Sequence, residues 1–194
     1  MKTYEIAQLI EKEAPQELAY SWDNVGILCG DGKKEVKKAL LTLDTNENTV
    51  DEAIQNKCDM IISHHPILLG GIKRIDYSSA DGRMLRKLIQ NDITVFAAHT
   101  NMDTAEHGIN DALALLLGIK DAEIIEKNGG FVNTIAESQY RLSRMETISA
   151  RVSWSQSATM VAPQLRTVST QLAGANPSAA IVSMERSLFS SPAQ

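Results

Sequence analysis

The chain of 194 residues is poor in cysteine and contains no long hydrophobic run. Its two cysteines, Cys29 and Cys58, are too few for a disulfide framework and lack the spacing of a thiolate metal site. No segment approaches the roughly 18 consecutive apolar residues of a membrane-spanning helix, and the opening segment lacks the apolar core of a signal peptide. These absences predict a protein of a reducing compartment, which we expect to be cytoplasmic and without a membrane partner.

A large excess of positive charge is also missing. The formal net charge is -5, with 22% charged and 43% apolar residues, as in an ordinary globular protein. This balance argues against a protein that coats nucleic acid, so we do not expect a nucleic-acid partner. A small anionic substrate stays compatible with it, because the local charge of a cleft can oppose the net charge.

Lysine and histidine are absent from residues 128–194, where the only acidic residues are Glu137, Glu146 and Glu185. All four histidines and every lysine lie in residues 1–127. Such a change predicts a boundary near Lys127, where Asn-Gly-Gly is also a turn signal. We therefore expect a domain over 1–127 and a divergent C-terminal segment over 128–194, which is either a small accessory unit or a partly ordered extension.

Within residues 1–127, short apolar segments alternate with amphipathic ones. Apolar residues at helical spacing predict four helices, over residues 3–14, 47–57, 81–91 and 108–117. Continuous apolar runs predict five strands, over residues 25–29, 39–43, 58–63, 93–98 and 122–125. The alternation favours crossover connections. The predicted fold class is α/β, with a layered, largely parallel sheet flanked by helices and a poorly defined C-terminal extension.

Metal-competent side chains follow the second, third and fourth predicted strands directly: Asp44, then His64 and His65, then the segment from His99 to Asp103. In open α/β sheets, ligands bind at the carboxyl edge of the strands. Imidazoles and carboxylates without a thiolate are typical of a catalytic divalent metal site that keeps a coordination position for water. The sequence therefore predicts a metal site at this edge.

Several of these side chains have alternative roles. Asp44 fits a cap of the following helix as well as a catalytic or orienting role, and Thr45 and Asn46 are further candidates for that cap. For His99 we expect a buried ring that is hydrogen-bonded to the backbone, and for His107 a solvent-facing position at the start of a helix.

Two further segments fit either a functional site or a purely structural role. Residues 22–26 form either a loop of the site or a turn in which Trp22 plugs the core, and we expect the plug. Lys73 and Arg74 would suit a substrate phosphate, but a solvated basic loop is the simpler interpretation. The two cysteines are expected in the core.

A family resemblance rests on four motifs in this order: Trp22-Asp23-Asn24-Val25-Gly26, Leu43-Asp44, Ser63-His64-His65-Pro66 and His99-Thr100-Asn101-Met102-Asp103. The segment Gly108-Ile109-Asn110-Asp111-Ala112-Leu113 follows them. Together they closely resemble the type 2 homologues of GTP cyclohydrolase I, also known as the Ngg-interacting-factor-three-like family. The resemblance covers about residues 1–127.

The resemblance implies a dinuclear metal site in a ring-shaped homo-oligomer, usually a hexamer of two-domain subunits. His64, His65 and Asp103 match the N-terminal metal ligands of the family, with zinc, iron, manganese or a similar divalent ion as the cofactor, one or two per subunit. Asp44 would orient the water or a metal-bound histidine. A nucleotide substrate is implied by the family name alone.

The C-terminal segment departs from the family pattern. The family completes its site with a His-x-x-x-Glu motif in its second half, but this sequence has no histidine after His107. We therefore expect one weakly held metal ion or an empty site, unless Asp44, His99 or a neighbouring subunit supplies further ligands.

The leading functional hypothesis is a metal-dependent, hydrolase-like protein resembling GTP cyclohydrolase 1 type 2, with an incomplete dinuclear site. In such an enzyme the metal lowers the pKa of water to about 7. Two alternatives remain: a non-catalytic metal-binding scaffold that acts through homo-oligomerisation, and a metal-dependent phosphoesterase.

Overall fold

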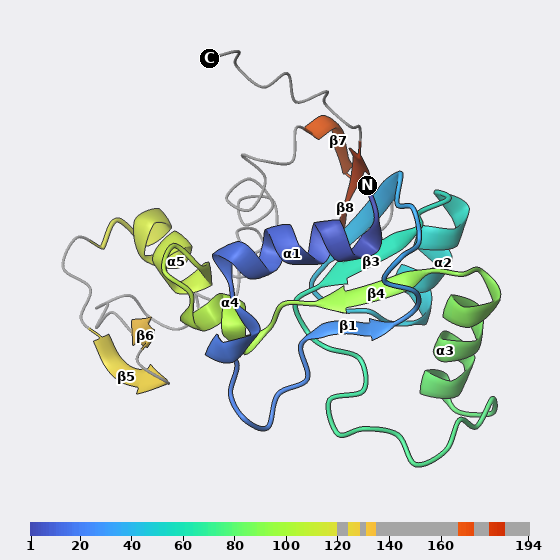
Figure 1. Cartoon of the computed structure of the whole chain (residues 1–194), viewed down its shortest axis with the longest axis horizontal. Helices are drawn as coiled ribbons and strands as arrows, with labels where there is room; N and C mark the ends of the chain where they lie inside the picture. Colours follow the sequence, from blue (N-terminus) through green and yellow to red (C-terminus); the bar gives the residue numbers. More distant parts are fainter. Residues whose placement is uncertain (120–123, 129–130, 135–166, 173–178, 185–194) are drawn as a thin grey trace.

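A six-stranded mixed sheet forms the centre of the computed structural model, which describes residues 1–119, 124–128, 131–134, 167–172 and 179–184 (Figure 1). The strand order is β1-β4-β3-β2-β8-β7. The strands are β1 (Gly26–Cys29), β2 (Lys38–Thr42), β3 (Met60–Ser63), β4 (Thr94–Ala97), β7 (Thr167–Leu172) and β8 (Ala179–Met184). The three central strands β2, β3 and β4 are parallel. The predicted α/β class is confirmed, and the antiparallel strands lie towards the two edges.

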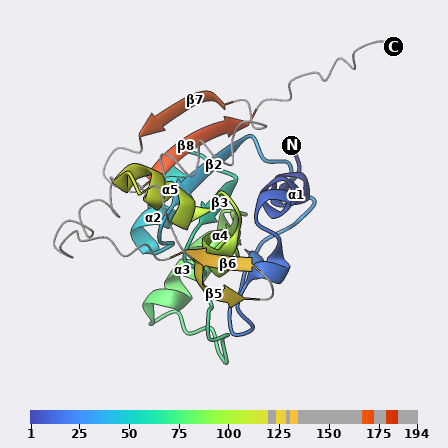
Figure 2. The same cartoon turned by 90° about the vertical axis from the view of Figure 1, so that its left-hand side faces the viewer.

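Helices cover both faces of this sheet, and Figure 2 shows α1 on one side and α2 and α3 on the other. The helices are α1 (Thr3–Glu13), α2 (Glu47–Gln55), α3 (Ala80–Gln90), α4 (Thr100–Thr104) and α5 (Ile109–Leu117), with a 3-10 turn over Gln16–Leu18. Four of these helices correspond to the predicted ones. The fifth, α4, is not among the predicted helices.

Successive residues of the central strands enter two separate hydrophobic clusters, because neighbouring side chains on a strand point to opposite faces. On the face of α2 and α3, Leu40, Ile61 and Val95 pack against both helices. On the opposite face, Leu41 and Phe96, among others, pack against α1. This double burial explains why the middle positions of the central strands are apolar on both faces, and it fixes their register.

Local capping sets the ends of two helices beside the sheet. The side chain of Asn46 accepts hydrogen bonds from the backbone N–H groups of Asn48 and Thr49, so Asn46 and not Asp44 caps α2. At the other end of the domain Gly118 ends α5 in the left-handed conformation, with φ of 70°. The carboxylate of Asp44 is thereby available for another contact.

Two described strands of the C-terminal segment, β7 and β8, join the central sheet. Strand β8 pairs antiparallel with β2, and Ile181 and Val182 are buried on the two faces. The strand predicted at 122–125 corresponds to β5 (Ile124–Asn128), which pairs with β6 (Phe131–Thr134) in a separate two-stranded sheet. The domain boundary at residue 127 stays a prediction. Among the described residues, no helix is both long enough and apolar enough to cross a membrane.

Candidate metal centre

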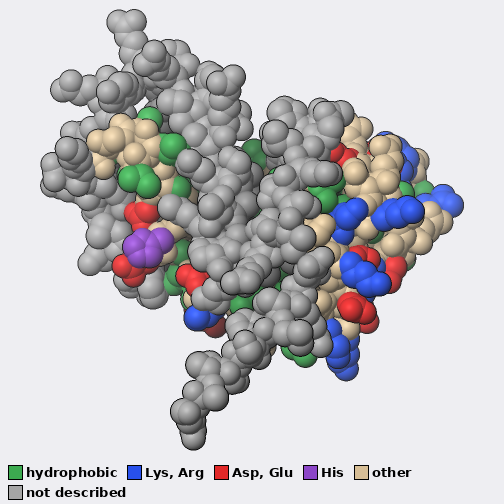
Figure 3. All heavy atoms as spheres, turned by 90° about the horizontal axis from the view of Figure 1, so that it is seen from above, with side chains coloured by type: hydrophobic (Ala, Val, Ile, Leu, Met, Phe, Trp, Pro, Cys, Tyr) green, Lys and Arg blue, Asp and Glu red, His purple; other side chains and the backbone are tan. Residues whose placement is uncertain are grey.

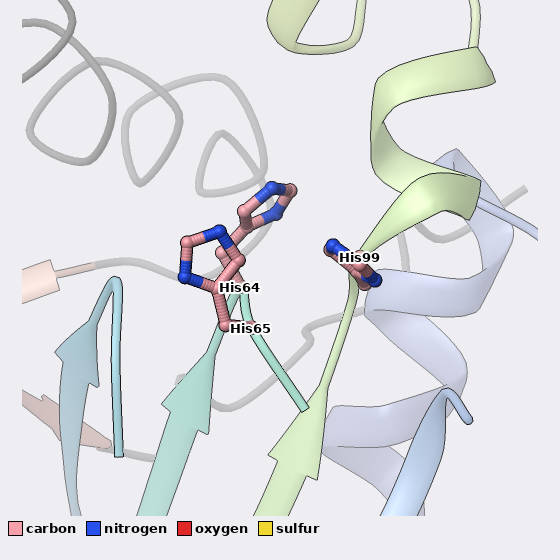
Figure 4. A group of neighbouring side chains, drawn as sticks. All are labelled: His64, His65 and His99. Atoms are coloured by element: carbon pink, nitrogen blue, oxygen red, sulfur yellow. The ribbon is translucent and has the colours of Figure 1, made fainter. Parts of the chain in front are cut away.

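Two adjacent parallel strands bring three histidines to the same edge of the sheet (Figure 4). Ser63 at the end of β3 pairs with Ala97 at the end of β4. His64 and His65 follow β3, and His99 follows β4. One ligand atom from each of the three rings lies within 4.8 Å of the others, which is a group able to hold a metal ion.

The two neighbouring histidines reach one site because the strand ends just before them, at Ser63. The hydroxyl of Ser63 donates to the carbonyl oxygen of His65 over 2.9 Å, which fixes the turn after β3. His64 is buried, whereas the side chain of His65 is 47% exposed. Their ring centroids are still only 4.9 Å apart, and both lie near the ring of His99, at 5.0 Å and 5.6 Å.

Each of the three rings is held through Nδ1. The Nδ1 of His64 lies 3.0 Å from the carbonyl oxygen of Ala98, which can only accept a hydrogen bond. The Nδ1 atoms of His65 and His99 lie 2.7 Å and 3.0 Å from carboxylate oxygens of aspartates. A proton on Nδ1 leaves Nε2 as the nitrogen that each ring would present to a metal, and this orientation by an oxygen acceptor is the usual one for metal-ligating histidine.

Burial keeps the innermost ring neutral at physiological pH. Desolvation lowers the pKa of His64 to about 4, against the smaller raising effect of its hydrogen bond to Ala98. A histidine must be neutral to donate a lone pair to a metal ion. His64 therefore needs no deprotonation before it binds a metal at pH 7.

Asp103 adds a carboxylate to the histidine cluster. It lies in the first turn of α4, the helix whose N-cap residue is His99. Its Oδ1 is 3.7 Å from Nε2 of His64. Burial raises the pKa of Asp103 to about 6, against the lowering effect of the neighbouring histidine charges. A partly buried carboxylate with a raised pKa is a group that a cation would stabilise.

The two aspartates that hold the outer rings differ in burial. The side chain of Asp44 is 59% exposed and contacts His65, whereas the side chain of Asp23 is fully buried and contacts His99. Burial alone would raise the pKa of Asp23, but hydrogen bonds from His99, Thr100 and Asn24 lower it below its ordinary value. Asp23 is thus a charged, well-bonded acceptor for the Nδ1–H group of His99.

Two expectations for this region were wrong. His99 is not hydrogen-bonded to the backbone through its ring, because Asp23 provides the acceptor instead. Trp22 does not plug the core, since it is 58% exposed. Residues 22–26 therefore contribute to the site through Asp23. The sequence contained the signal, a Trp-Asp pair in a turn, but the partner of that aspartate lies 76 positions away.

The other candidates lie apart from the cluster. His107 is exposed at the start of α5, as expected, and its side chain is 83% accessible. Lys73 and Arg74 are exposed in the loop between β3 and α3. Cys58 is buried and Cys29 is half-buried, and both are free thiols.

The chain belongs to the Duf34/NIF3 (NGG1p interacting factor 3) family, whose sequence model matches residues 1–183. Within this family, the protein is 48% identical over 124 residues to a GTP cyclohydrolase 1 type 2 homolog of Listeria innocua, which covers 64% of this chain and 33% of the relative. A homolog from Clostridium acetobutylicum is 39% identical over 128 residues, covering 66% of this chain and 48% of the relative. The chain thus spans about a third to a half of these relatives.

Solved structures support the same fold. Reduced HcgD from Methanocaldococcus jannaschii is 31% identical and superimposes with a TM-score of 0.65, covering 77% of this chain and 59% of that protein. The Staphylococcus aureus protein SA1388 is 42% identical with a TM-score of 0.61, over 64% of this chain and 36% of that protein. The family match reaches β8, whose pairing with β2 places it in the central sheet.

Proposed function

We propose that His64, His65, His99 and Asp103 bind one divalent metal ion, and that the chain is a metal-dependent, hydrolase-like member of its family. The observation that carries the proposal is the convergence of three imidazoles whose Nδ1 atoms are all held by oxygen acceptors. Three imidazoles and one carboxylate suit zinc, iron or manganese. Compared with the set expected from the sequence, the proposal adds His99.

In this proposal the protein's own groups orient the ligands. A bound divalent ion would supply Lewis acidity, which makes water a usable nucleophile near neutral pH. Asp44 fixes the ring of His65 and Asp23 fixes the ring of His99, so that both are positioning residues. Asp103 would compensate the charge of the ion. Within the part of the chain that the structure describes, a second ion would have to share these same side chains, which is why a single ion is proposed.

A nucleotide substrate and a homo-oligomer are part of the proposal. The relatives named above are GTP cyclohydrolase 1 type 2 homologs, and the chain spans only part of their length. Assembly would bring further ligands to the exposed side of His65. Nucleic acid is not proposed, because Lys and Arg are interspersed with Asp and Glu among the coloured side chains of Figure 3. The free thiols fit the reducing, cytoplasmic setting expected from the sequence.

Metal analysis of a matched pair of variants tests this proposal. His99→Asn removes one of the three rings, whereas His107→Asn changes an exposed histidine outside the cluster. Asparagine suits position 107 because φ is 61° there, a conformation that Asn adopts more readily than most residues. We expect His99→Asn to lose bound zinc or manganese after dialysis and His107→Asn to retain it. Equal metal content in both variants would contradict the proposal.

Catalysis needs its own assay. We expect the metal-loaded chain to release formate from GTP and the chelator-treated chain to release none. The alternative function is a metal-binding scaffold without turnover, which the lack of any histidine after His107 favours. Metal binding without formate release would support the scaffold and remove the cyclohydrolase activity from the proposal.

A further inference from the structure

An exposed indole, that of Trp22, stands beside the histidine cluster and stacks on the half-buried ring of Tyr20. Trp22 is 58% exposed. Its ring meets the ring of His99 edge-on, with 6.2 Å between centroids and 73° between planes. Tyr20 stacks on the indole at 5.7 Å and 14°. Tyr20 therefore covers one face of the indole, and the remaining exposed surface of Trp22 is what a ligand would meet.

The turn that carries Trp22 is fixed at both ends to the start of α4. The backbone N–H of Asp23 donates to the carbonyl oxygen of Tyr20 over 2.9 Å and closes the turn. The backbone N–H of Tyr20 donates to the Thr100 hydroxyl over 3.0 Å, and the Thr100 backbone N–H donates to the Asp23 carboxylate over 3.1 Å. The indole is thus presented on a rigid support, which reduces the entropy lost when a ligand binds.

Position and rigidity separate Trp22 from the other exposed apolar side chains. A single exposed hydrophobic residue needs no explanation by itself. Tyr77 is similarly exposed, at 57%, but it lies in the loop before α3, where Arg86 covers its ring at 5.0 Å. Trp22 instead contacts His99, a member of the histidine cluster, so the exposed indole lies directly beside the proposed metal site.

We infer that Trp22 is a stacking platform for a planar heteroaromatic ring, such as a purine, of the molecule that reaches the histidine cluster. A ring stacked on the indole would have its edge directed towards His99. The inference rests on the proposed function for the site beside the platform and adds the residue that would bind the base of the proposed nucleotide. The indole contributes a large aromatic face, and base stacking on such a face tolerates different bases.

The local charge decides which probe should be used. Asp23, Asp44 and Asp103 surround the cluster, so without a cation a phosphate would meet these carboxylates. An uncharged nucleoside avoids this repulsion. Inosine therefore tests the platform in the metal-free chain, and ribose is the matched uncharged probe that lacks the base.

The experiment is a fluorescence titration of the full chain after chelator treatment. The sequence has two tryptophans, so Trp154→Phe leaves Trp22 as the only one. We expect saturable quenching by inosine and none by ribose. In calorimetry, Trp22→Ala should weaken inosine binding about 5- to 150-fold, as expected for the loss of one base stack. Trp22→Phe should lose less, and Tyr77→Ala should bind as the unaltered chain does.

Three results would overturn the inference: no saturable quenching by inosine, equal binding of ribose, or equal losses in Trp22→Ala and Tyr77→Ala. Failure here is distinguishable from failure of the metal site. Inosine binding by a chain that binds no metal refutes the proposed function alone, and metal binding without inosine binding refutes the platform alone.

Discussion

Replacing the buried carboxylate of Asp23 by an amide is expected to weaken metal binding although Asp23 is not itself a proposed ligand. In the protein the carboxylate accepts hydrogen bonds from the Nδ1–H of His99, the backbone N–H and hydroxyl of Thr100 and the backbone N–H of Asn24. An asparagine at this position has one oxygen instead of two. Its NH2 group would face at least one donor, because the side chain is fully buried.

Asp23→Asn is expected to lower both the folding stability and the metal affinity. A buried donor left without its acceptor costs about 1–3 kcal/mol of folding free energy, which corresponds to a fall in Tm of about 2–4 °C per kcal/mol for a chain of this size. Loss of the acceptor also releases His99 from its tautomer and orientation. Changes in such orienting residues typically cost about 10- to 100-fold in metal affinity, and we expect a loss in this range.

The assay is competition of Zn²⁺ between the protein and a chromophoric chelator, with Tm measured on the same samples. Asp44→Asn is the matched control, because Asp44 also orients a histidine but is 59% exposed. Its folding stability should change by less than about 0.5 kcal/mol, as for most surface substitutions, while zinc affinity falls less than in Asp23→Asn. Unchanged zinc affinity in a folded Asp23→Asn protein would refute the positioning role.

Three further predictions concern the frame of the site. Asn46→Ala should cost about 0.5–2 kcal/mol of stability through loss of the α2 cap, whereas Asn48→Ala, which leaves the cap acceptor in place, should cost much less in chemical denaturation. Gly30→Ala should prevent or strongly weaken folding, because φ is 108° there and a Cβ would stand 2.5 Å from the side chain of Thr94; a soluble variant with unchanged Tm would contradict this. Burial raises the pKa of Cys58 to about 11. An unfolded thiol has a pKa of about 8.5. The contribution of the neutral, buried thiol to the free energy of unfolding is therefore complete below about pH 8.5 and is lost as the pH rises towards 11. The native thiol should resist alkylation at about pH 8 and react on unfolding.

The central part of the fold was predictable from the sequence because its residues are constrained on both faces. Leu40 and Leu41 enter different clusters, so the middle of β2 is apolar on both faces, with Lys38 and Thr42 at its two ends. Strand direction at the edges was not predictable in this way. The burial pattern of β1 is the same whether it runs parallel or antiparallel to β4, and only the tertiary pairing decides it.

The residue types of the candidate metal ligands were predictable from the sequence, but the residues that orient these ligands were not. His64 and His65 follow an apolar strand directly, which is a local signal. The role of His99 depends on Asp23, 76 residues earlier in the chain, and a contact between such distant positions leaves no spacing pattern. Helix α4 was missed for a related reason: its five residues include two threonines and an asparagine, which have low helix propensity, and it is held by contacts such as that of Asn101 with the carbonyl oxygen of Ala14.

X-ray absorption at the zinc edge of the metal-loaded full chain, with metal content measured on the same sample, tests the central claim most directly. We predict about one zinc ion per chain, with the scattering of three imidazoles around it, and fewer imidazoles in His99→Asn than in His107→Asn. A chain that binds no zinc, or a zinc environment that is unchanged in His99→Asn, would contradict the account.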